Sequence, residues 1–396
     1  MPQGGRFVNS PLPTNTNVIP KENKKLSFKL DFQAYTLIIA LILIALIFGF
    51  FTNGEFLSSR NLSNLFTQMS VVAVLAIGMT LVIVAGHIDL SIGSLVGLTG
   101  GIAAILQVWF GMNTVVVVIA AVAVGALVGL WQGWWVAYRA VPAFIVTLGG
   151  MLIFRGILIG ISEGQTIAPL NDSFKLIGNS YLPYSLGYII AAVSVVLLFM
   201  STARTRVKRQ SMGLAVSSTL VLYGRITVYS FFALLITYML NRYLGIPISM
   251  LIAVSFAGLF LFVSLKTSFG RYVYAIGGNA EAAALSGINI KRNVLYVFIL
   301  MGALAGVAGV LLTSRLNAAT VSAGNMLELD VIAACVIGGT SLMGGKGKII
   351  GAIIGALIMA SIDNGMSMMN IETFWQYIVK GSILIFAVWL DISSKK

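Results

Sequence analysis

The sequence predicts an all-α polytopic integral membrane protein. Of its 396 residues, 58% are hydrophobic and only 9% are charged, and the mean hydropathy is +0.98. Soluble domains carry about 25% charged residues, so this composition cannot supply a water-facing surface. Apolar runs close to the roughly 20 residues that cross a bilayer recur along the chain. These runs are continuous rather than alternating, which favours helices over barrel strands.

The apolar runs define twelve candidate segments. In chain order they lie at 34–51, 70–85, 92–108, 115–137, 144–161, 187–200, 228–239, 250–265, 294–313, 331–339, 349–362 and 375–390. Some are too short to cross alone, so we expect about ten to twelve membrane segments, including broken or re-entrant helices. The chain then divides into a polar cytoplasmic tail at 1–33, a single transmembrane domain at 34–392 and, within that domain, a polar cytoplasmic loop at 266–292.

Basic residues indicate the orientation. If the N-terminus is inside and the segments alternate, most of the 25 Lys and Arg residues are cytoplasmic, and only Arg60, Lys175, Arg242 and Arg315 fall outside. Cytoplasmic loops are enriched in Lys and Arg, so both termini are expected in the cytoplasm. The tail has no small-residue cleavage site after the first apolar run, and we expect no cleaved signal peptide. The net charge of +13 is dispersed between apolar runs, which argues against a nucleic-acid partner.

Two pairs of segments are interrupted by small polar residues at corresponding places in the two halves of the chain. The first break is GHIDLS at 86–91, and the second is GGTSLMGGKG at 338–347. Paired broken helices commonly line a transport path, because irregular backbone at membrane depth is tolerated only inside protein or beside water. The pattern therefore predicts two pseudo-symmetric halves. Two ordinary tight loops are the alternative.

The loop at 266–292 contains the pattern of a short helix. Asn279 is a good N-cap, Glu281 falls in the first turn where the helix dipole favours an acid, and Gly287 suits a left-handed stop. The Ala-rich face between them is smooth enough to lie in a groove of a partner protein. The alternative is a solvated connector whose caps are incidental.

The same loop resembles a known family. Its run at 281–287 is similar to the cytoplasmic coupling motif of permease subunits in bacterial ATP-binding-cassette (ABC) importers. The first break resembles the monosaccharide (ribose-type) branch, and GWWVAYR at 133–139 and DNGMSMM at 363–369 are most similar to D-xylose permeases within it. The resemblance covers nearly everything after residue 30 except 201–223. The ATPase-coupling residues that it implies are Gly270, Arg271, Asn279, Glu281, Ala282, Ala283 and Gly287.

The resemblance implies the permease subunit of an ATP-driven importer of a monosaccharide, D-xylose, in a bacterial inner membrane. The implied partners are a second copy of the chain, a cytoplasmic ATPase and a periplasmic or extracellular sugar-binding protein. This chain is expected to bind no cofactor, and ATP and Mg²⁺ belong to the partner ATPase. The sequence agrees, because its nearest approach to a Walker loop has Thr340 where Gly is needed and Gly347 where Ser or Thr is needed.

Two other function classes have less support. An ion-coupled secondary sugar transporter acting without an ATPase is the alternative, but such carriers normally use intramembrane acids, and this chain offers few beyond Asp89 and Asp330. An enzyme needs a converging catalytic set, and one His, one Cys and scattered acids supply none. We therefore expect a pore subunit that is no enzyme and holds no metal.

Polar residues near the breaks and the last segment are candidates for the translocation path. Amide and carboxylate groups bind sugar hydroxyls, and aromatic rings pack on sugar faces. Each candidate has a structural alternative, since Asp89 is also a suitable cap for the following helix and Trp375 suits an interfacial aromatic belt. The candidates are Asp89, Ser91, Asp363, Asn364, Trp375 and Gln376.

Several interior residues have structural explanations. Arg155 lies in an apolar segment, so we expect it to pair with a carboxylate or with backbone carbonyls inside the bundle. Contact with the substrate is the alternative. Cys335 lies in an apolar run and is expected to be an inert core residue. Gly302, Gly306 and Gly309 recur at helical spacing, which predicts close helix crossing.

Overall fold

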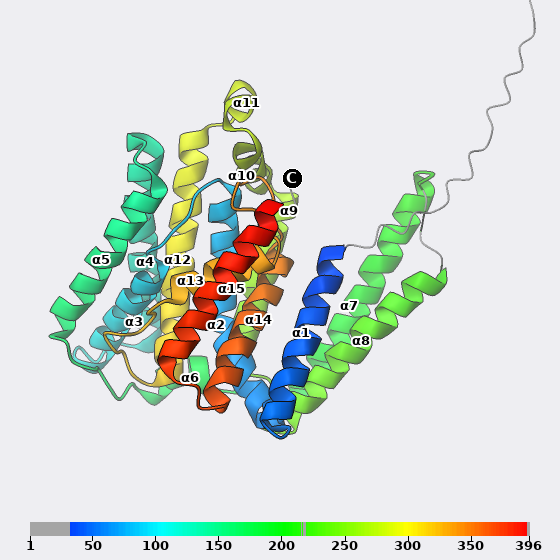
Figure 1. The fold of residues 1–396 in the computed structure, drawn as a ribbon, viewed down its shortest axis with the longest axis horizontal. Coiled ribbons are helices and arrows are strands. Elements are labelled where there is room, and N and C mark those ends of the chain that lie inside the picture. Colours follow the sequence, from blue (N-terminus) through cyan, green and yellow to red (C-terminus); the bar gives the residue numbers. More distant parts are fainter. Residues whose placement is uncertain (1–31, 215, 217–218, 394–396) are drawn as a thin grey trace, which may run out of the picture. The chain divides into compact units, whose positions relative to one another are not determined.

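Every regular element in the described part of the chain, residues 32–214, 216 and 219–393, is helical in this computed structural model (Figure 1). The all-α prediction is confirmed, and the predicted tail lies largely outside the described residues. The elements are α1 (Phe32–Phe51), η1 (Glu55–Leu57), α2 (Ser59–Val84), α3 (Ile92–Val108), α4 (Thr114–Arg139), α5 (Ala143–Ser162), α6 (Asp172–Asn179), α7 (Tyr184–Ser211), α8 (Thr219–Asn241), α9 (Ile248–Lys266), α10 (Ser268–Gly278), α11 (Ala280–Leu285), α12 (Ile290–Leu316), α13 (Leu327–Ile337), α14 (Ile349–Met368) and α15 (Thr373–Ser393).

The helix lengths agree with a polytopic membrane protein. Among the described residues, nine helices are long and apolar enough to cross a membrane, and α3 and the part of α1 from Thr36 to Phe51 are shorter apolar helices. With eleven residues, α13 rises about 16 Å, roughly half of a 30 Å hydrocarbon core. The prediction of ten to twelve segments that include short helices is therefore confirmed, and α13 is one of the short ones.

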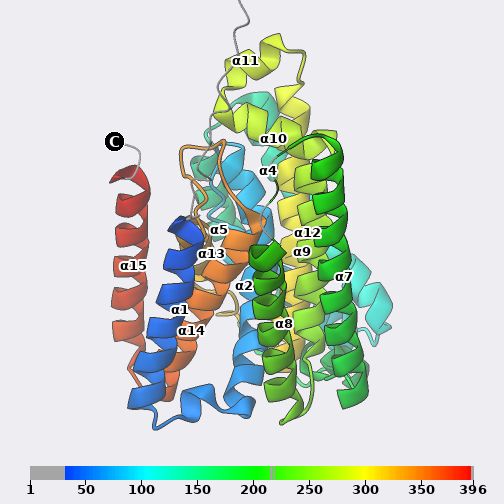
Figure 2. The same ribbon diagram turned by 90° about the vertical axis from the view of Figure 1, so that its right-hand side faces the viewer.

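Helix α2 forms the centre of the bundle. It contacts α8, α9, α12, α13 and α14, and Figures 1 and 2 place it among them. Every residue from Ser70 to Ala85 is buried, as expected for a helix that is apolar all round. The helix begins at Ser59 rather than at the predicted 70. Its polar first part is buried on one side only, where Asn61 Nδ2 donates to the Phe56 carbonyl and, at 2.8 Å, to Asn364 Oδ1; Arg60 and Asn64 are exposed.

Glycines bring α12 close to α4 and α3. A side chain at Gly302 would overlap the carbonyl oxygen of Gly125, and one at Gly306 would lie 2.7 Å from that of Ala121. A side chain at Gly309 would overlap Thr99 Oγ1 on α3. The predicted role of these α12 glycines in close helix crossing is confirmed.

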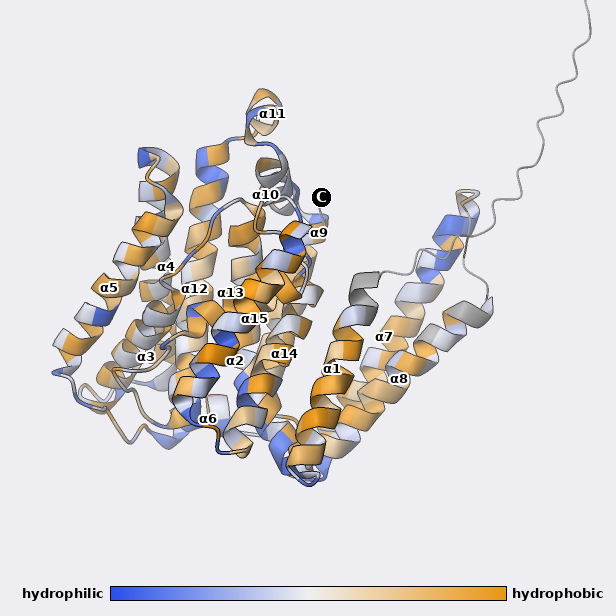
Figure 3. Cartoon of the chain, in the orientation of Figure 1, coloured by the Kyte–Doolittle hydropathy of each residue, from blue (hydrophilic) through white to orange (hydrophobic). Residues whose placement is uncertain are grey.

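The sequence did not predict the short helices α6 and α10. Several predicted segments are also shorter than the helices observed. In the stretch 201–223, which resembled nothing, α7 continues to Ser211 and α8 begins at Thr219. Outer helices such as α7, α8 and α15 expose apolar side chains, and Figure 3 shows hydrophobic colours along them. Such faces need lipid, which agrees with the membrane prediction.

Candidate functional site

The short helix α11 has the predicted caps. Asn279 Oδ1 accepts a hydrogen bond from the Ala282 amide at 2.9 Å, and Gly287 follows the helix with a φ of +82°. Ala283 is buried, whereas Glu281 is exposed. Leu285 is 86% exposed, the highest value among the large apolar side chains described. The predicted capped helix is therefore present, and its docking role stays a prediction.

Helix α10 anchors this loop to the bundle. Thr267 Oγ1 caps it by accepting from the Gly270 amide, and Val273 and Ile276 face the interior. A side chain at Gly270 would overlap the Ser264 carbonyl, so glycine allows the tight turn from α9. Arg271 is exposed, and its guanidinium donates to Ser268 Oγ at 3.2 Å. Of the predicted coupling residues, Gly270 and Ala283 therefore hold the loop in place, and Arg271 and Glu281 face outward.

The C-terminal end of α10 meets both breaks at a place that we name the glycine junction: residues 84–86, 277–278 and 344–347. The Gly345 amide donates to the Val84 carbonyl at 2.9 Å, and Tyr274 Oη donates to the Gly347 carbonyl at 2.8 Å. A Cβ on Gly277 would overlap the Val84 oxygen. The loop and the two breaks are far apart in the sequence, whereas the structure joins them.

The first break leads into α3 through a turn held by Asp89. Its Oδ1 accepts from the Ser91 amide at 2.8 Å and from Ser91 Oγ at 2.7 Å. Gln132 Nε2 on α4 donates to the same hydroxyl at 2.7 Å. Asp89 and Ser91 are both buried. These contacts close a turn before α3, whose N-cap residue is Ser91 rather than Asp89, and the role of Asp89 in the translocation path stays a prediction.

The short helices α3 and α13, one from each half of the chain, meet at their N-terminal ends. A side chain at Gly93 would overlap the Gly324 carbonyl and the Glu328 carboxylate. Arg155 on α5 donates to the Val321 and Ala323 carbonyls in the approach to α13. The predicted pairing of Arg155 with backbone carbonyls is confirmed. These contacts place the irregular backbone before both helices inside the protein, as a bilayer requires.

The path candidates Asp363, Asn364, Trp375 and Gln376 do not all lie in one place. Asp363 and Gln376 line a polar cavity, whereas Asn364 is buried against Asn61. Trp375 is 52% exposed and lies against the neighbouring Phe374 ring, which fits the interfacial alternative. The structure thus brings only two of the four residues to one cavity.

Two residues that the path prediction missed complete this cavity. Lys380 Nζ on α15 lies 2.8 Å from Asp330 Oδ2 on α13 and 2.8 Å from Asp363 Oδ2 on α14. A lysine and an aspartate inside apolar segments were the available sequence signal, because buried charges must find partners. Cys335 is fully buried beside Thr80, as predicted for a core residue.

Comparison with known proteins decides the family. Residues 61–388 match the family described as branched-chain amino acid transport system / permease component. The chain belongs to this permease family. It is 50% identical over 367 residues to the xylose transport system permease protein XylH of Escherichia coli K12, covering 93% of each chain. The Haemophilus influenzae XylH is 50% identical over 369 residues, covering 92% of this chain and 98% of the relative.

A more distant relative is the ribose import permease protein RbsC of E. coli K12, 36% identical over 356 residues, with 90% of this chain and 92% of the relative covered. No solved structure matches. Family membership makes the chain a multi-pass inner-membrane permease subunit of an ABC transport system. It is a non-enzymatic pore subunit whose family works with an ATPase and a binding protein.

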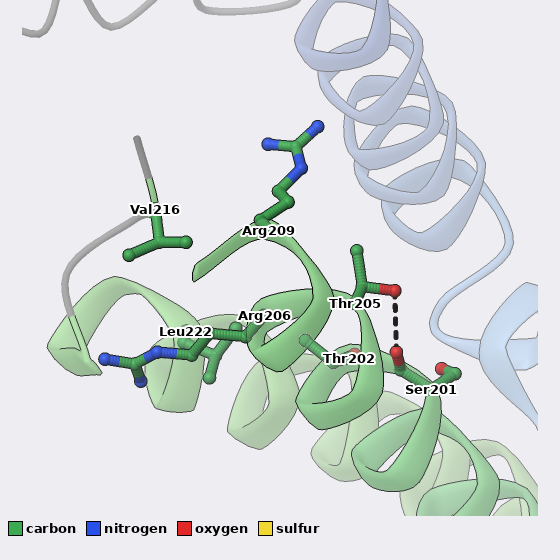
Figure 4. A pocket seen from close by; sticks show the side chains of 7 residues that line it. All are labelled: Ser201, Thr202, Thr205, Arg206, Arg209, Val216 and Leu222. Atoms are coloured by element: carbon green, nitrogen blue, oxygen red, sulfur yellow. Dashed lines mark hydrogen bonds between the residues drawn. The ribbon is translucent and has the colours of Figure 1, made fainter. Parts of the chain in front are cut away.

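Another cavity lies between the end of α7 and the start of α8. Figure 4 shows its lining, in which Arg206 and Arg209 extend in different directions. Arg206 donates to Thr219 Oγ1 at 2.7 Å. The cavity measures about 230 Å³, less than the roughly 300 Å³ of small-molecule sites, and none of its lining residues is buried. It is therefore a surface feature rather than a substrate site.

The cap of α11 gives a testable prediction. Replacing Asn279 with Ala removes the acceptor for the Ala282 amide, a change that costs about 1 kcal/mol at an N-cap. Amide hydrogen exchange over residues 281–285 is expected to accelerate about fivefold. Asn279→Asp keeps a capping oxygen and should exchange at the wild-type rate. Unchanged exchange in the Ala variant would mean that other contacts hold the helix.

Proposed function

We propose that this permease imports D-xylose across the bacterial inner membrane. The observation that carries the substrate is the 50% identity to xylose transport system permeases over 93% of the chain. Identity to the ribose import permease is 36%. Both relatives are named for a pentose, and the more similar one is named for xylose. The sugar-binding protein supplies most of the affinity, and the permease binds sugar weakly so that the sugar can pass.

The proposed topology places both termini, α10 and α11 in the cytoplasm. Basic residues support this orientation, because they gather at the α11 end of the bundle, for example Arg139 at the end of α4 and Lys208 and Arg209 in the last turn of α7. Figure 3 shows hydrophilic colours at that end of α7. The residues predicted outside lie at the other end, such as Lys175 in α6 and Arg315 at the end of α12.

The proposed assembly is a homodimer of this permease, a cytoplasmic ATPase pair that hydrolyses ATP with Mg²⁺, and a sugar-binding protein on the other side. The loop at 266–292 docks into the ATPase. The exposed Leu285 supplies an apolar anchor for that groove, and the exposed Glu281 and Arg271 supply charges at its rim. The sequence has no Walker loop of its own, which supports a separate ATPase.

The glycine junction supports a mechanism for coupling. Movement of α11 by the ATPase pulls on α10, whose end contacts both breaks without intervening side chains. The first break precedes the short helix α3 and the second break follows the short helix α13, and the N-terminal ends of these helices meet at Gly93 and Gly324. Backbone packed against backbone transmits a small displacement because it has little room to deform. The movement of the loop therefore shifts α3 and α13 and alternates access to the path.

Uptake into vesicles tests the function. The permease reconstituted with its ATPase and binding protein should take up labelled D-xylose only when ATP and Mg²⁺ are supplied on the α11 side. The permease alone should show no uptake driven by a proton or sodium gradient. Gradient-driven uptake by the permease alone would overturn the importer proposal in favour of an ion-coupled carrier.

Charge reversal at the loop is a second test. Glu281→Lys should leave the permease folded and inserted, because the side chain is exposed, but should abolish most sugar-stimulated ATP hydrolysis by detaching or uncoupling the ATPase. Glu163→Lys is the matched control, since Glu163 is also exposed but follows α5 at the opposite end. Co-purification of a fully active complex from Glu281→Lys would contradict the docking role.

A further inference from the structure

The C-terminal end of α7 carries a concentrated group of basic residues, Arg204, Arg206, Lys208 and Arg209. Helix α7 has 28 residues and therefore rises about 42 Å, which exceeds the roughly 30 Å of a hydrocarbon core. Its continuous apolar run ends at Met200. The four basic residues therefore lie just beyond the hydrocarbon, at the depth of the lipid headgroups, and on the cytoplasmic side in the proposed topology.

Within the described part of the chain, no acidic side chain forms an ion pair with these four basic residues. The sequence has no Asp or Glu between Asp172 and Glu281, and the tail at 1–31 has five basic and only two acidic residues. By contrast, Arg139 at the end of α4 has an aromatic partner, since its Cζ lies 4.6 Å from the centroid of the Trp134 ring. The negative charge that balances the α7 group is left for another molecule to supply.

The cavity between α7 and α8 favours a ligand that accepts hydrogen bonds. The hydroxyls of its lining already donate to carbonyls three or four residues earlier in α7, and they belong to Ser201, Thr202 and Thr205. Arg206 donates one N–H to Thr219 Oγ1, and Arg209 donates none to any described residue. Figure 4 shows the Arg209 guanidinium directed away from the other lining side chains. The free donors of this lining are therefore guanidinium N–H groups, which match the oxygens of a phosphate.

The surroundings of this cavity fit a lipid better than a soluble phosphate compound. Val216 and Leu222 add apolar groups to its lining. Further along the two helices, towards the membrane, α7 and α8 expose apolar side chains such as Leu197 and Val228. A cavity of about 230 Å³ holds a headgroup but not the acyl chains, which would lie along these exposed faces. A soluble anion would contact the arginines alone.

We propose that the adjoining ends of α7 and α8 bind the phosphate of an anionic phospholipid of the inner membrane. Arg206 and Arg209 donate to the phosphate oxygens, while Arg204 and Lys208 add attraction to the negatively charged membrane surface. Basic clusters directly after a span and basic pockets between transmembrane helices both favour anionic lipids. The bound lipid holds the α7–α8 hairpin at a fixed depth. This inference goes beyond sugar import and does not depend on the identity of the sugar.

Lipid titration tests the proposal on the full-length permease. The protein in a mild detergent is titrated with phosphatidylglycerol or with phosphatidylcholine of the same acyl chains, and bound lipid is counted by native mass spectrometry. Phosphatidylcholine should bind about tenfold more weakly, because it has no net negative charge. Inorganic phosphate should not displace phosphatidylglycerol, because it has no acyl chains. Equal affinity for the two lipids would overturn the proposal, and displacement by inorganic phosphate would overturn it in favour of a soluble anion.

Matched double variants locate the bound lipid. Arg206→Gln with Arg209→Gln removes both guanidinium groups from the cavity, and the affinity for phosphatidylglycerol should fall about thirtyfold, because each basic residue near an anionic headgroup contributes a factor of about five. Arg204→Gln with Lys208→Gln removes the same charge from the same end of α7, but neither residue lines the cavity, so the affinity should fall less than about fivefold. Thermal unfolding verifies that both variants are folded. Equal losses of affinity would mean diffuse attraction to charge and would overturn the site.

Discussion

Gly277→Ala is expected to uncouple the permease from its ATPase. A methyl group at this position would overlap the Val84 carbonyl oxygen and lie 2.6 Å from the Gly345 amide nitrogen, two atoms that hydrogen-bond to each other. Because all the atoms met are backbone, α10 must move away from both breaks. Overpacking of this kind costs about 3 kcal/mol at its upper end. We expect a lower midpoint of thermal unfolding and sugar-stimulated ATP hydrolysis close to the basal rate.

The neighbouring glycine supplies the control. A methyl group on Gly278 meets no atom within 4 Å, so Gly278→Ala adds the same group to the same helix end without displacing anything. Replacing a helical glycine with alanine stabilises a protein by up to about 1 kcal/mol where the conformation allows it. Gly277→Ala should therefore lower the stability of the permease, whereas Gly278→Ala should raise it. Full coupling in Gly277→Ala would show that the glycine junction does not transmit the movement.

The helices and breaks could be predicted because their signals are local. A run of apolar residues marks a span, and Asn279 with Gly287 marks the caps of α11, since these preferences act over a few residues. The start of α2 was misplaced because Asn61 is buried through a bond to Asn364, far along the chain. Helix α10 was missed because its apolar face is short and its neighbours are polar.

The candidate sites depended on contacts that a single sequence does not reveal. The coupling loop was recognised from its resemblance, but its link to Val84 and Gly345 arises only when three separate segments pack together. Asp363 was selected for its position after a span, whereas its partner Lys380 lies on the next helix. Intramembrane charges were a usable signal, and combining Asp330 with Lys380 would have found the cavity.

Lys380→Met is expected to be the most destabilising single change in the half of the bundle opposite α11. It leaves the carboxylates of Asp330 and Asp363, each 2.8 Å from Lys380 Nζ, without their shared counter-ion. Removing one partner of a buried pair costs about 3–5 kcal/mol, and we expect the lower end because the Asp363 side chain is 29% exposed. A lower midpoint of thermal unfolding in nanodiscs measures the loss.

Two comparisons isolate the cause of that loss. Lys175→Met breaks the ion pair with Asp172, whose side chain is 97% exposed, and should change stability by less than about 1 kcal/mol because water screens the charges. Combining Lys380→Met with Asp330→Asn and Asp363→Asn removes all three charges and should recover most of the stability. Stability that stays low in the triple variant would mean that Lys380 acts through packing of α15 rather than through its charge.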